Sequence, residues 1–140
     1  QVYFEATTPT NNEFFIYMDT HSKLTLEGVG MKVPEKHQSA IGMSASELSI
    51  RNSTIFSKID LSEGSKLTLE NVHIEIFGNN TIHAKDSEVI AKNSTITGGD
   101  LEKDFPPVWL RNVIWESENC KIELPTGTGV CLDNNVQFIQ

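Results

Sequence analysis

The stretch Ser65-Lys66-Leu67-Thr68-Leu69-Glu70-Asn71-Val72 returns along this chain with small changes. Together with this stretch there are five copies, at residues 22–29, 46–53, 65–72, 87–94 and 106–113. Self-similarity at a spacing of 19 to 24 residues is typical of proteins that stack one small structural unit on the next. A single unit is too small to bury its own apolar side, so we expect the units to share one continuous core.

The apolar residues of each copy fall at its third and fifth positions, as at Leu67 and Leu69. Alternation with a period of two predicts a strand with one buried face. A second short strand is expected after each copy, at residues 29–31, 53–55, 72–74, 94–96 and 113–115, and a third before several copies, at residues 14–18, 41–43, 59–61 and 82–84. A looser coil can be traced at residues 130–138. The sequence therefore predicts an all-β parallel β-helix, or β-solenoid, of about five to six coils with three short strands in each coil.

The seventh position of the copies holds residues that tolerate a left-handed backbone. These residues are Gly28, Asn52, Asn71, Asn93 and Asn112. Glycine and asparagine adopt positive φ angles at the lowest cost. We therefore expect a recurring bend at this position, with the stacked asparagine side chains hydrogen-bonded to one another along the column.

The charged positions of the copies alternate in sign from one copy to the next. The second position reads Lys23, Glu47, Lys66, Glu88, and the sixth reads Glu27, Arg51, Glu70, Lys92, Arg111. Neighbouring strands lie ~4.8 Å apart, so these side chains are expected to be direct neighbours. Six of the seven steps pair opposite charges, and the exception is Lys92 beside Arg111. Such pairing fixes the register, because a slip by one coil would place like charges together.

Length and charge limit the class of protein. We expect one domain, residues 1–140, in which residues 14–138 form the coils and residues 1–13 form an N-terminal edge strand or cap. The formal net charge of −8 argues against a nucleic-acid partner, which would need a basic surface. No run of 18 apolar residues is present, so membrane insertion is not predicted. The chain begins at Gln1 rather than Met, which we interpret as a hint of secretion.

The two cysteines, Cys120 and Cys131, are separated by ten residues. They could close a local disulfide or remain two free thiols, and the sequence leaves both interpretations open. Neither has a second Cys or a His at ligand spacing, so no metal site is predicted. No cofactor is predicted.

The copies resemble the repeats of the right-handed parallel β-helix superfamily, the pectin-lyase-like fold. The resemblance is strongest to β-solenoid repeats of bacterial surface and secreted proteins of the adhesin type, and it rests on the repeated phrase and on residues 87–97. It implies a right-handed column and a secreted or cell-surface setting. Polysaccharide-cleaving members carry clusters of charged residues on the outer face of one sheet. The outward positions of the copies here are Thr25, Ser49, Thr68, Ile90 and Trp109, which lack an acid.

Three groups of outward-facing side chains are candidate sites. Asp60 and His83 occupy the same position in successive coils, so the carboxylate could orient the imidazole as a general base; a surface charge pair is the alternative. Trp109, with Phe105 nearby, is a candidate ligand anchor, unless the 98–105 loop covers it. His73 and Glu75 face outward near Thr54 and Thr95, where we expect a solvated surface.

These features favour a non-enzymatic recognition or structural domain of a secreted or cell-surface bacterial protein, with carbohydrate or protein as its ligand. One alternative is a polysaccharide-active enzyme, or a fragment of one, that uses Asp60 and His83. Another alternative is a solenoid that self-assembles end to end, because the sequence contains no amphipathic helix to cover the ends of the column.

Overall fold

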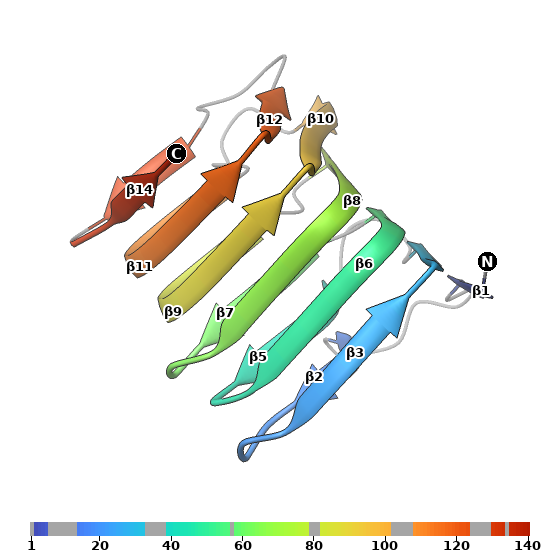
Figure 1. Cartoon of the computed structure of the whole chain (residues 1–140), viewed down its shortest axis with the longest axis horizontal. Helices are drawn as coiled ribbons and strands as arrows, with labels where there is room; N and C mark the ends of the chain where they lie inside the picture. Colours follow the sequence, from blue (N-terminus) through green and yellow to red (C-terminus); the bar gives the residue numbers. More distant parts are fainter. Residues whose placement is uncertain are drawn as a thin grey trace.

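The computed structural model describes residues 2–5, 14–32, 39–56, 58–78, 82–101, 108–123, 130–133 and 135–140. Within these ranges the regular elements are all strands (Figure 1). They are β1 (Val2–Glu5), β2 (Phe14–Met18), β3 (Lys23–Glu27), β4 (Val29–Lys32), β5 (Ser39–Ser44), β6 (Glu47–Phe56), β7 (Lys58–Ser62), β8 (Lys66–Gly78), β9 (Ile82–Lys92), β10 (Thr95–Leu101), β11 (Val108–Glu118), β12 (Lys121–Glu123), β13 (Val130–Asp133) and β14 (Gln137–Ile139). The described residues include no helix that could span a membrane.

Three parallel sheets run along the column. Sheet A contains β2, β5, β7, the first part of β9, the first part of β11, and β13. Sheet B contains β3, the first parts of β6 and β8, the second parts of β9 and β11, and β14. Sheet C contains β1, β4, the second parts of β6 and β8, β10 and β12. The chain passes from A to B to C in every turn, through an A–B corner and a B–C corner.

The predicted β-solenoid is confirmed, with a slightly smaller number of turns. Within the described residues, four strands of each sheet are paired on both sides, and the strand at either end of the sheet is paired on one side only. The column therefore has about four turns. The estimate of five to six coils also counted the end coils, which have a neighbour on one side.

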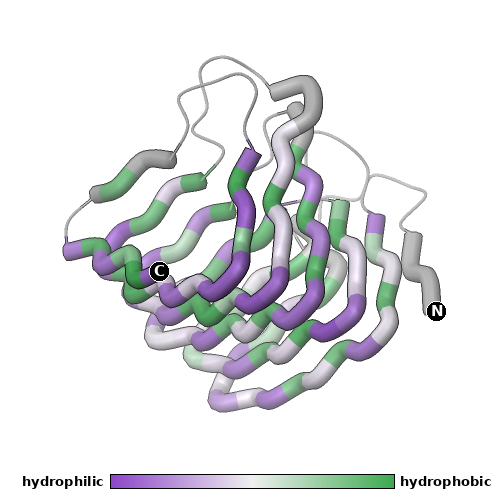
Figure 2. The backbone as a smooth tube through the Cα atoms, turned by 45° about the horizontal axis from the view of Figure 1, so that its top comes forward, coloured by the Kyte–Doolittle hydropathy of each residue, from purple (hydrophilic) through white to green (hydrophobic). Residues whose placement is uncertain are grey.

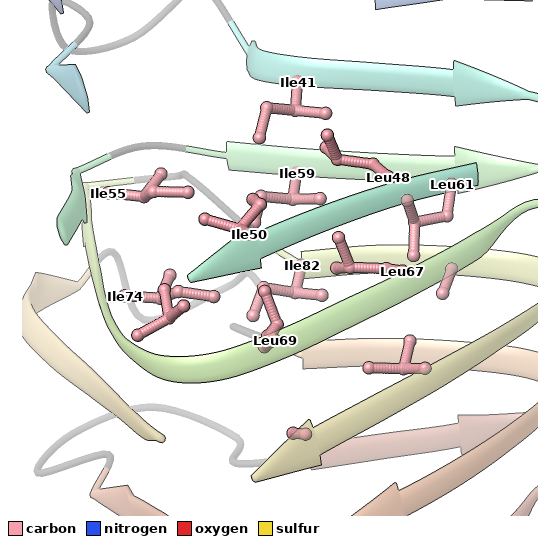
Figure 3. Packing of buried hydrophobic residues seen from close by; sticks show 14 of the residues in the cluster. Ile41, Leu48, Ile50, Ile55, Ile59, Leu61, Leu67, Leu69, Ile74 and Ile82 are labelled. Carbon is pink, nitrogen blue, oxygen red and sulfur yellow. The ribbon is translucent and has the colours of Figure 1, made fainter. Parts of the chain in front are cut away.

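The core is a set of apolar rows, each made of one inward residue per turn. Figure 2 shows the alternation of hydrophobic and hydrophilic residues along the strands that produces these rows. Figure 3 shows Ile41, Ile59 and Ile82 from sheet A facing leucine and isoleucine side chains from sheet B, with Ile55 and Ile74 from sheet C beside them. Burial of each such side chain contributes roughly 1.5–3 kcal/mol. This thin but continuous core is what the third and fifth positions of the repeat encode.

The fifth copy of the repeat was assigned to the wrong sheet. The structure places residues 108–111 in sheet A, where Trp109 pairs with His83, rather than in sheet B beside the other copies. The true fifth strand of sheet B starts at Val113, which pairs with Ser87, and continues to Glu118, which pairs with Lys92. The error arose because Arg111-Asn112-Val113 looks like the end of a copy, and both corners of the column accept asparagine.

Two corner rows replace the single asparagine row that was predicted. Gly28, Asn52, Asn71 and Asn93 lie at the B–C corner with φ between 48° and 63°, as predicted, and Asn119 (φ 52°) is the next member of the row. Asn112 lies instead at the A–B corner, where its Nδ2 donates to Asp86 Oδ1 at 2.7 Å. Side-chain hydrogen bonds run along the B–C corner from Asn52 to Glu27, from Asn71 to Asn52 and from Asn119 to Asn93.

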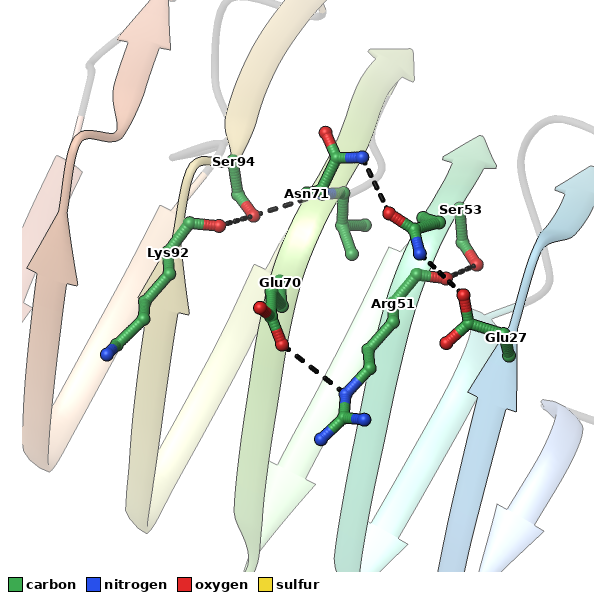
Figure 4. Close-up of polar contacts among 9 residues, drawn as sticks. Glu27, Arg51, Ser53, Glu70, Asn71, Lys92 and Ser94 are labelled. Carbon is green, nitrogen blue, oxygen red and sulfur yellow. Dashed lines mark hydrogen bonds and ion pairs between the residues drawn. The ribbon is translucent and has the colours of Figure 1, made fainter.

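The corrected register removes the one mismatch in the charge rows. Glu118, not Arg111, follows Lys92 in sheet B, so all seven stacked steps now pair opposite charges. The ion pairs Arg51–Glu70 and Lys92–Glu118 both span 3.4 Å, and Figure 4 shows the first of these. These side chains are more than half exposed, so each pair contributes little to stability and mainly fixes the register.

Buried serines satisfy the backbone at the B–C corner. Ser94 Oγ accepts a hydrogen bond from the Val72 N–H at 3.1 Å and donates to the Lys92 carbonyl at 2.8 Å (Figure 4). Ser53 does the same for the Val29 N–H and the Arg51 carbonyl. The hydroxyl therefore links one turn to the next where the bend interrupts the ladder of backbone hydrogen bonds.

Candidate functional site

The outer face of sheet A brings three of the candidate residues into one row. Asp60 pairs with His83 across β7 and β9, and His83 pairs with Trp109 across β9 and β11. All three residues are partly buried. Two sites that the sequence treated separately, the Asp60–His83 pair and Trp109, are thus one surface, which we name the sheet A row.

Asp60 and His83 form the predicted contact. The distance from His83 Nδ1 to Asp60 Oδ1 is 3.0 Å, and the two side chains are 26% and 28% exposed. In neutral histidine, donation from Nδ1 to the carboxylate leaves Nε2 as the acceptor. The contact therefore restrains the orientation of the imidazole beside the carboxylate.

Trp109 completes the row by stacking on the other side of the imidazole. The ring centroids of His83 and Trp109 lie 4.5 Å apart and the ring planes differ by 18°. Because this separation is close to the strand spacing of ~4.8 Å, the rings stack along the column axis. One face of the indole is therefore covered, and Trp109 presents a ring edge rather than a flat platform.

The assignment of Trp109 to the outer row of sheet B was wrong. That place belongs to Glu116, which pairs with Ile90 and is exposed. The outer row of sheet B is consequently Thr25, Ser49, Thr68, Ile90 and Glu116. It does contain an acid, so the argument against an enzyme from the lack of one does not hold.

Two residues that sequence reasoning did not single out extend the sheet A row. Gly42 is the strand neighbour of Asp60, and Tyr17 is the strand neighbour of Gly42. Gly42 has no side chain, so the surface is low beside the Asp60 carboxylate, whereas Tyr17 is 58% exposed beyond it. Four strand spacings separate Tyr17 from Trp109, or about 19 Å at ~4.8 Å each. The alternation in residues 14–18 and 41–43 was the signal that could have placed both residues in this row.

Two of the remaining candidates are Phe105 and the cysteine pair. Phe105 lies outside the described residues. Cys120 is a free thiol that donates to the Glu118 carbonyl at 3.3 Å, so the disulfide left open by the sequence does not form. The reason is topological, because Cys120 follows the B–C corner whereas Cys131 pairs with Trp109 in sheet A.

The sheet A row can act chemically in two ways. It offers hydrogen-bonding groups of fixed orientation between two aromatic side chains, which suits a polar ligand lying along the column. It also offers an oriented imidazole that could act as a base, although the row neighbours of the pair, Gly42 and Trp109, carry neither a second acid nor a nucleophile.

Comparison of this chain with protein-family models, with curated proteins and with solved structures finds no match.

Proposed function

We propose that this chain is a non-enzymatic recognition domain that binds a carbohydrate along the sheet A row. The observation that supports this most directly is the row of Asp60, His83 and Trp109. The His83 imidazole contacts the Asp60 carboxylate on one side and stacks on the Trp109 indole on the other. The adhesin-like role and the secreted or cell-surface setting belong to the same proposal and rest on the resemblance of the repeats.

The chemistry of the row favours a carbohydrate over a protein ligand. A sugar presents hydroxyl groups beside C–H groups, and the row presents an oriented carboxylate–imidazole pair beside an indole edge. Partial burial of the three side chains lowers the entropic cost of ordering them on binding. The length of about 19 Å from Tyr17 to Trp109 suits an extended chain of sugars better than a single one.

The test is a panel of polysaccharides assayed for retention of the domain and for release of new chain ends. Retention without release is the expected result for a recognition domain. If no member of the panel retained the domain or released new chain ends, the proposal would be contradicted.

Trp109→Ala is expected to raise the Kd for a retained polysaccharide about tenfold, or about 1.4 kcal/mol. The change removes the indole edge and also the ring that holds His83 in place. The Kd should be measured by calorimetry with a soluble oligosaccharide of the same repeat unit. Ile114→Ala is the matched control, because Ile114 is 42% exposed on the outer face of sheet B. If the two variants changed the Kd equally, Trp109 would not be part of the binding surface.

A second candidate function, polysaccharide cleavage, is favoured by the 3.0 Å contact between Asp60 and His83. In this case release of new chain ends should accompany retention. Asp60→Asn keeps the shape of the side chain but no longer orients the imidazole as a carboxylate does, so we expect release to be lost while retention persists. Release that continues undiminished in Asp60→Asn would show that this pair is not the catalytic base.

A further inference from the structure

The asparagine row at the B–C corner has one interrupted step. In the steps that are made, the amide of one turn donates to the side-chain oxygen of the preceding turn, as Asn71 Nδ2 does to Asn52 Oδ1 at 2.7 Å and Asn119 Nδ2 does to Asn93 Oδ1 at 2.8 Å. Among the described residues, no such bond joins Asn93 Nδ2 to Asn71 Oδ1. The backbone register is regular here, since Glu70 and Lys92 are paired directly before these two residues. The break therefore lies in the side chains and not in the fold.

A shallow groove of about 290 Å³ runs beside this break. Its lining includes Asn71 and Asn93 from the corner and Thr54, His73 and Thr95 from the outer face of sheet C. Thr54, His73 and Thr95 are direct strand neighbours, one from each of three successive turns. His73 Nε2 also lies 3.5 Å from Thr97 Oγ1, a contact that restrains the imidazole at the groove.

The groove is neutral in an acidic protein. The chain has a formal net charge of −8, yet none of the residues that line the groove is Asp, Glu, Lys or Arg. Amides, hydroxyls and an imidazole donate and accept hydrogen bonds without selecting a charge. A neutral ligand with several hydroxyl groups fits this lining, whereas a phosphate or a carboxylate would find no Lys or Arg side chain there.

We propose that this groove is a second saccharide-binding site, in which adjacent hydroxyl groups of one sugar close the interrupted step. One hydroxyl donates to Asn71 Oδ1 and its neighbour accepts from Asn93 Nδ2, while Thr95 and His73 bind the rest of the ring. The proposal deepens the carbohydrate-binding function and rests on it, but it concerns a different face of the column from the sheet A row.

Two variants test the site without disturbing the corner. Asn93→Asp removes the amide donor of the side chain. It keeps an oxygen that accepts the hydrogen bond from Asn119, and aspartate tolerates the positive φ of this position. Thr95→Val removes only a hydroxyl from the surface of a strand. The charge-matched control is Asn135→Asp at the A–B corner, and the control for the hydroxyl is Thr68→Val on the outer face of sheet B.

The experiment is a titration of the ¹⁵N-labelled domain with neutral linear tetrasaccharides of glucose, xylose and N-acetylglucosamine, followed by NMR. The side-chain amide signals of Asn71 and Asn93 are expected to shift, and Asn93→Asp and Thr95→Val should each raise the Kd about fivefold. The two controls should leave the Kd unchanged.

The outcomes separate this proposal from the sheet A proposal. If Trp109→Ala lost binding while Asn93→Asp and Thr95→Val had no effect, the proposal for the groove would be overturned and the proposal for the sheet A row would stand. The reverse pattern would support the groove and overturn the row. Absence of any shift with all three tetrasaccharides would overturn the groove, and the polysaccharide panel would still decide the row.

Discussion

Replacement of Trp115 by alanine is expected to lower the free energy of unfolding by about 3–5 kcal/mol. Trp115 is 2% exposed and lies in the inward row of sheet B between Val89 and Phe138. Its indole stacks on Phe138 with ring centroids 5.7 Å apart. In the neighbouring inward row of sheet B the side chains of the same two turns are small, Ala91 and Ser117. Both residues and Trp115 line an open cavity of about 210 Å³. Removing the indole would enlarge this cavity.

The loss should be measured by urea unfolding, with Trp109→Ala as the matched control. Trp109 lies on the outer face of sheet A and contacts His83 rather than the core, so its replacement should cost about 1 kcal/mol or less. The same variant is the binding-site test, and a small stability effect makes its binding result interpretable. Similar losses for the two variants would contradict the assignment of one indole to the core and the other to the surface.

The two tryptophans also show which structural features the sequence pattern can predict and which it cannot. Alternation predicted that Trp109 faces outward, and the structure confirms this; Trp115 is found on the inward face, 2% exposed. Alternation could not say which sheet each belongs to, because a period of two gives the face of a strand and not its position in the turn. Asn112 and Asn119 both have positive φ, one at each corner, so the sequence signal for a bend was duplicated. The charge rows contained the clue, since Lys92 beside Arg111 was the only like-charged step.

The candidate site was predicted in parts. The contact between Asp60 and His83 followed from aligning Ile59-Asp60-Leu61 with Ile82-His83-Ala84, and the structure confirms it. Trp109 could not be joined to this pair while it was assigned to sheet B. The interrupted step between Asn71 and Asn93 has no sequence signal at all, because both residues have the expected identity. Whether two stacked amides bond depends on side-chain torsions, which a repeat pattern does not encode.

Replacement of Ser94 by valine is expected to lower the free energy of unfolding by about 1–3 kcal/mol, although valine occupies the same place in two other turns. At the B–C corner this place reads Val29, Ser53, Val72, Ser94. The order has a physical cause, because each serine hydroxyl accepts the N–H of the valine in the turn before it. Ser94 is 4% exposed, so Ser94→Val would leave the Val72 N–H buried without its acceptor. Shape alone would tolerate the change; the missing hydrogen bond determines the cost.

The measurement for Ser94→Val is urea unfolding together with hydrogen exchange at the Val72 amide. That amide should exchange faster in the variant, whereas amides in the middle of β8, such as that of Leu69, should lose protection only in proportion to the global destabilisation. Ser49→Val is the matched control, because Ser49 lies on the outer face of sheet B and its replacement should change the free energy of unfolding by about 0.5 kcal/mol or less. If Ser94→Val proved as stable as the original chain, with the Val72 amide still protected, the hydrogen bond from Val72 to Ser94 would not stabilise the corner. The serines would then only occupy space there.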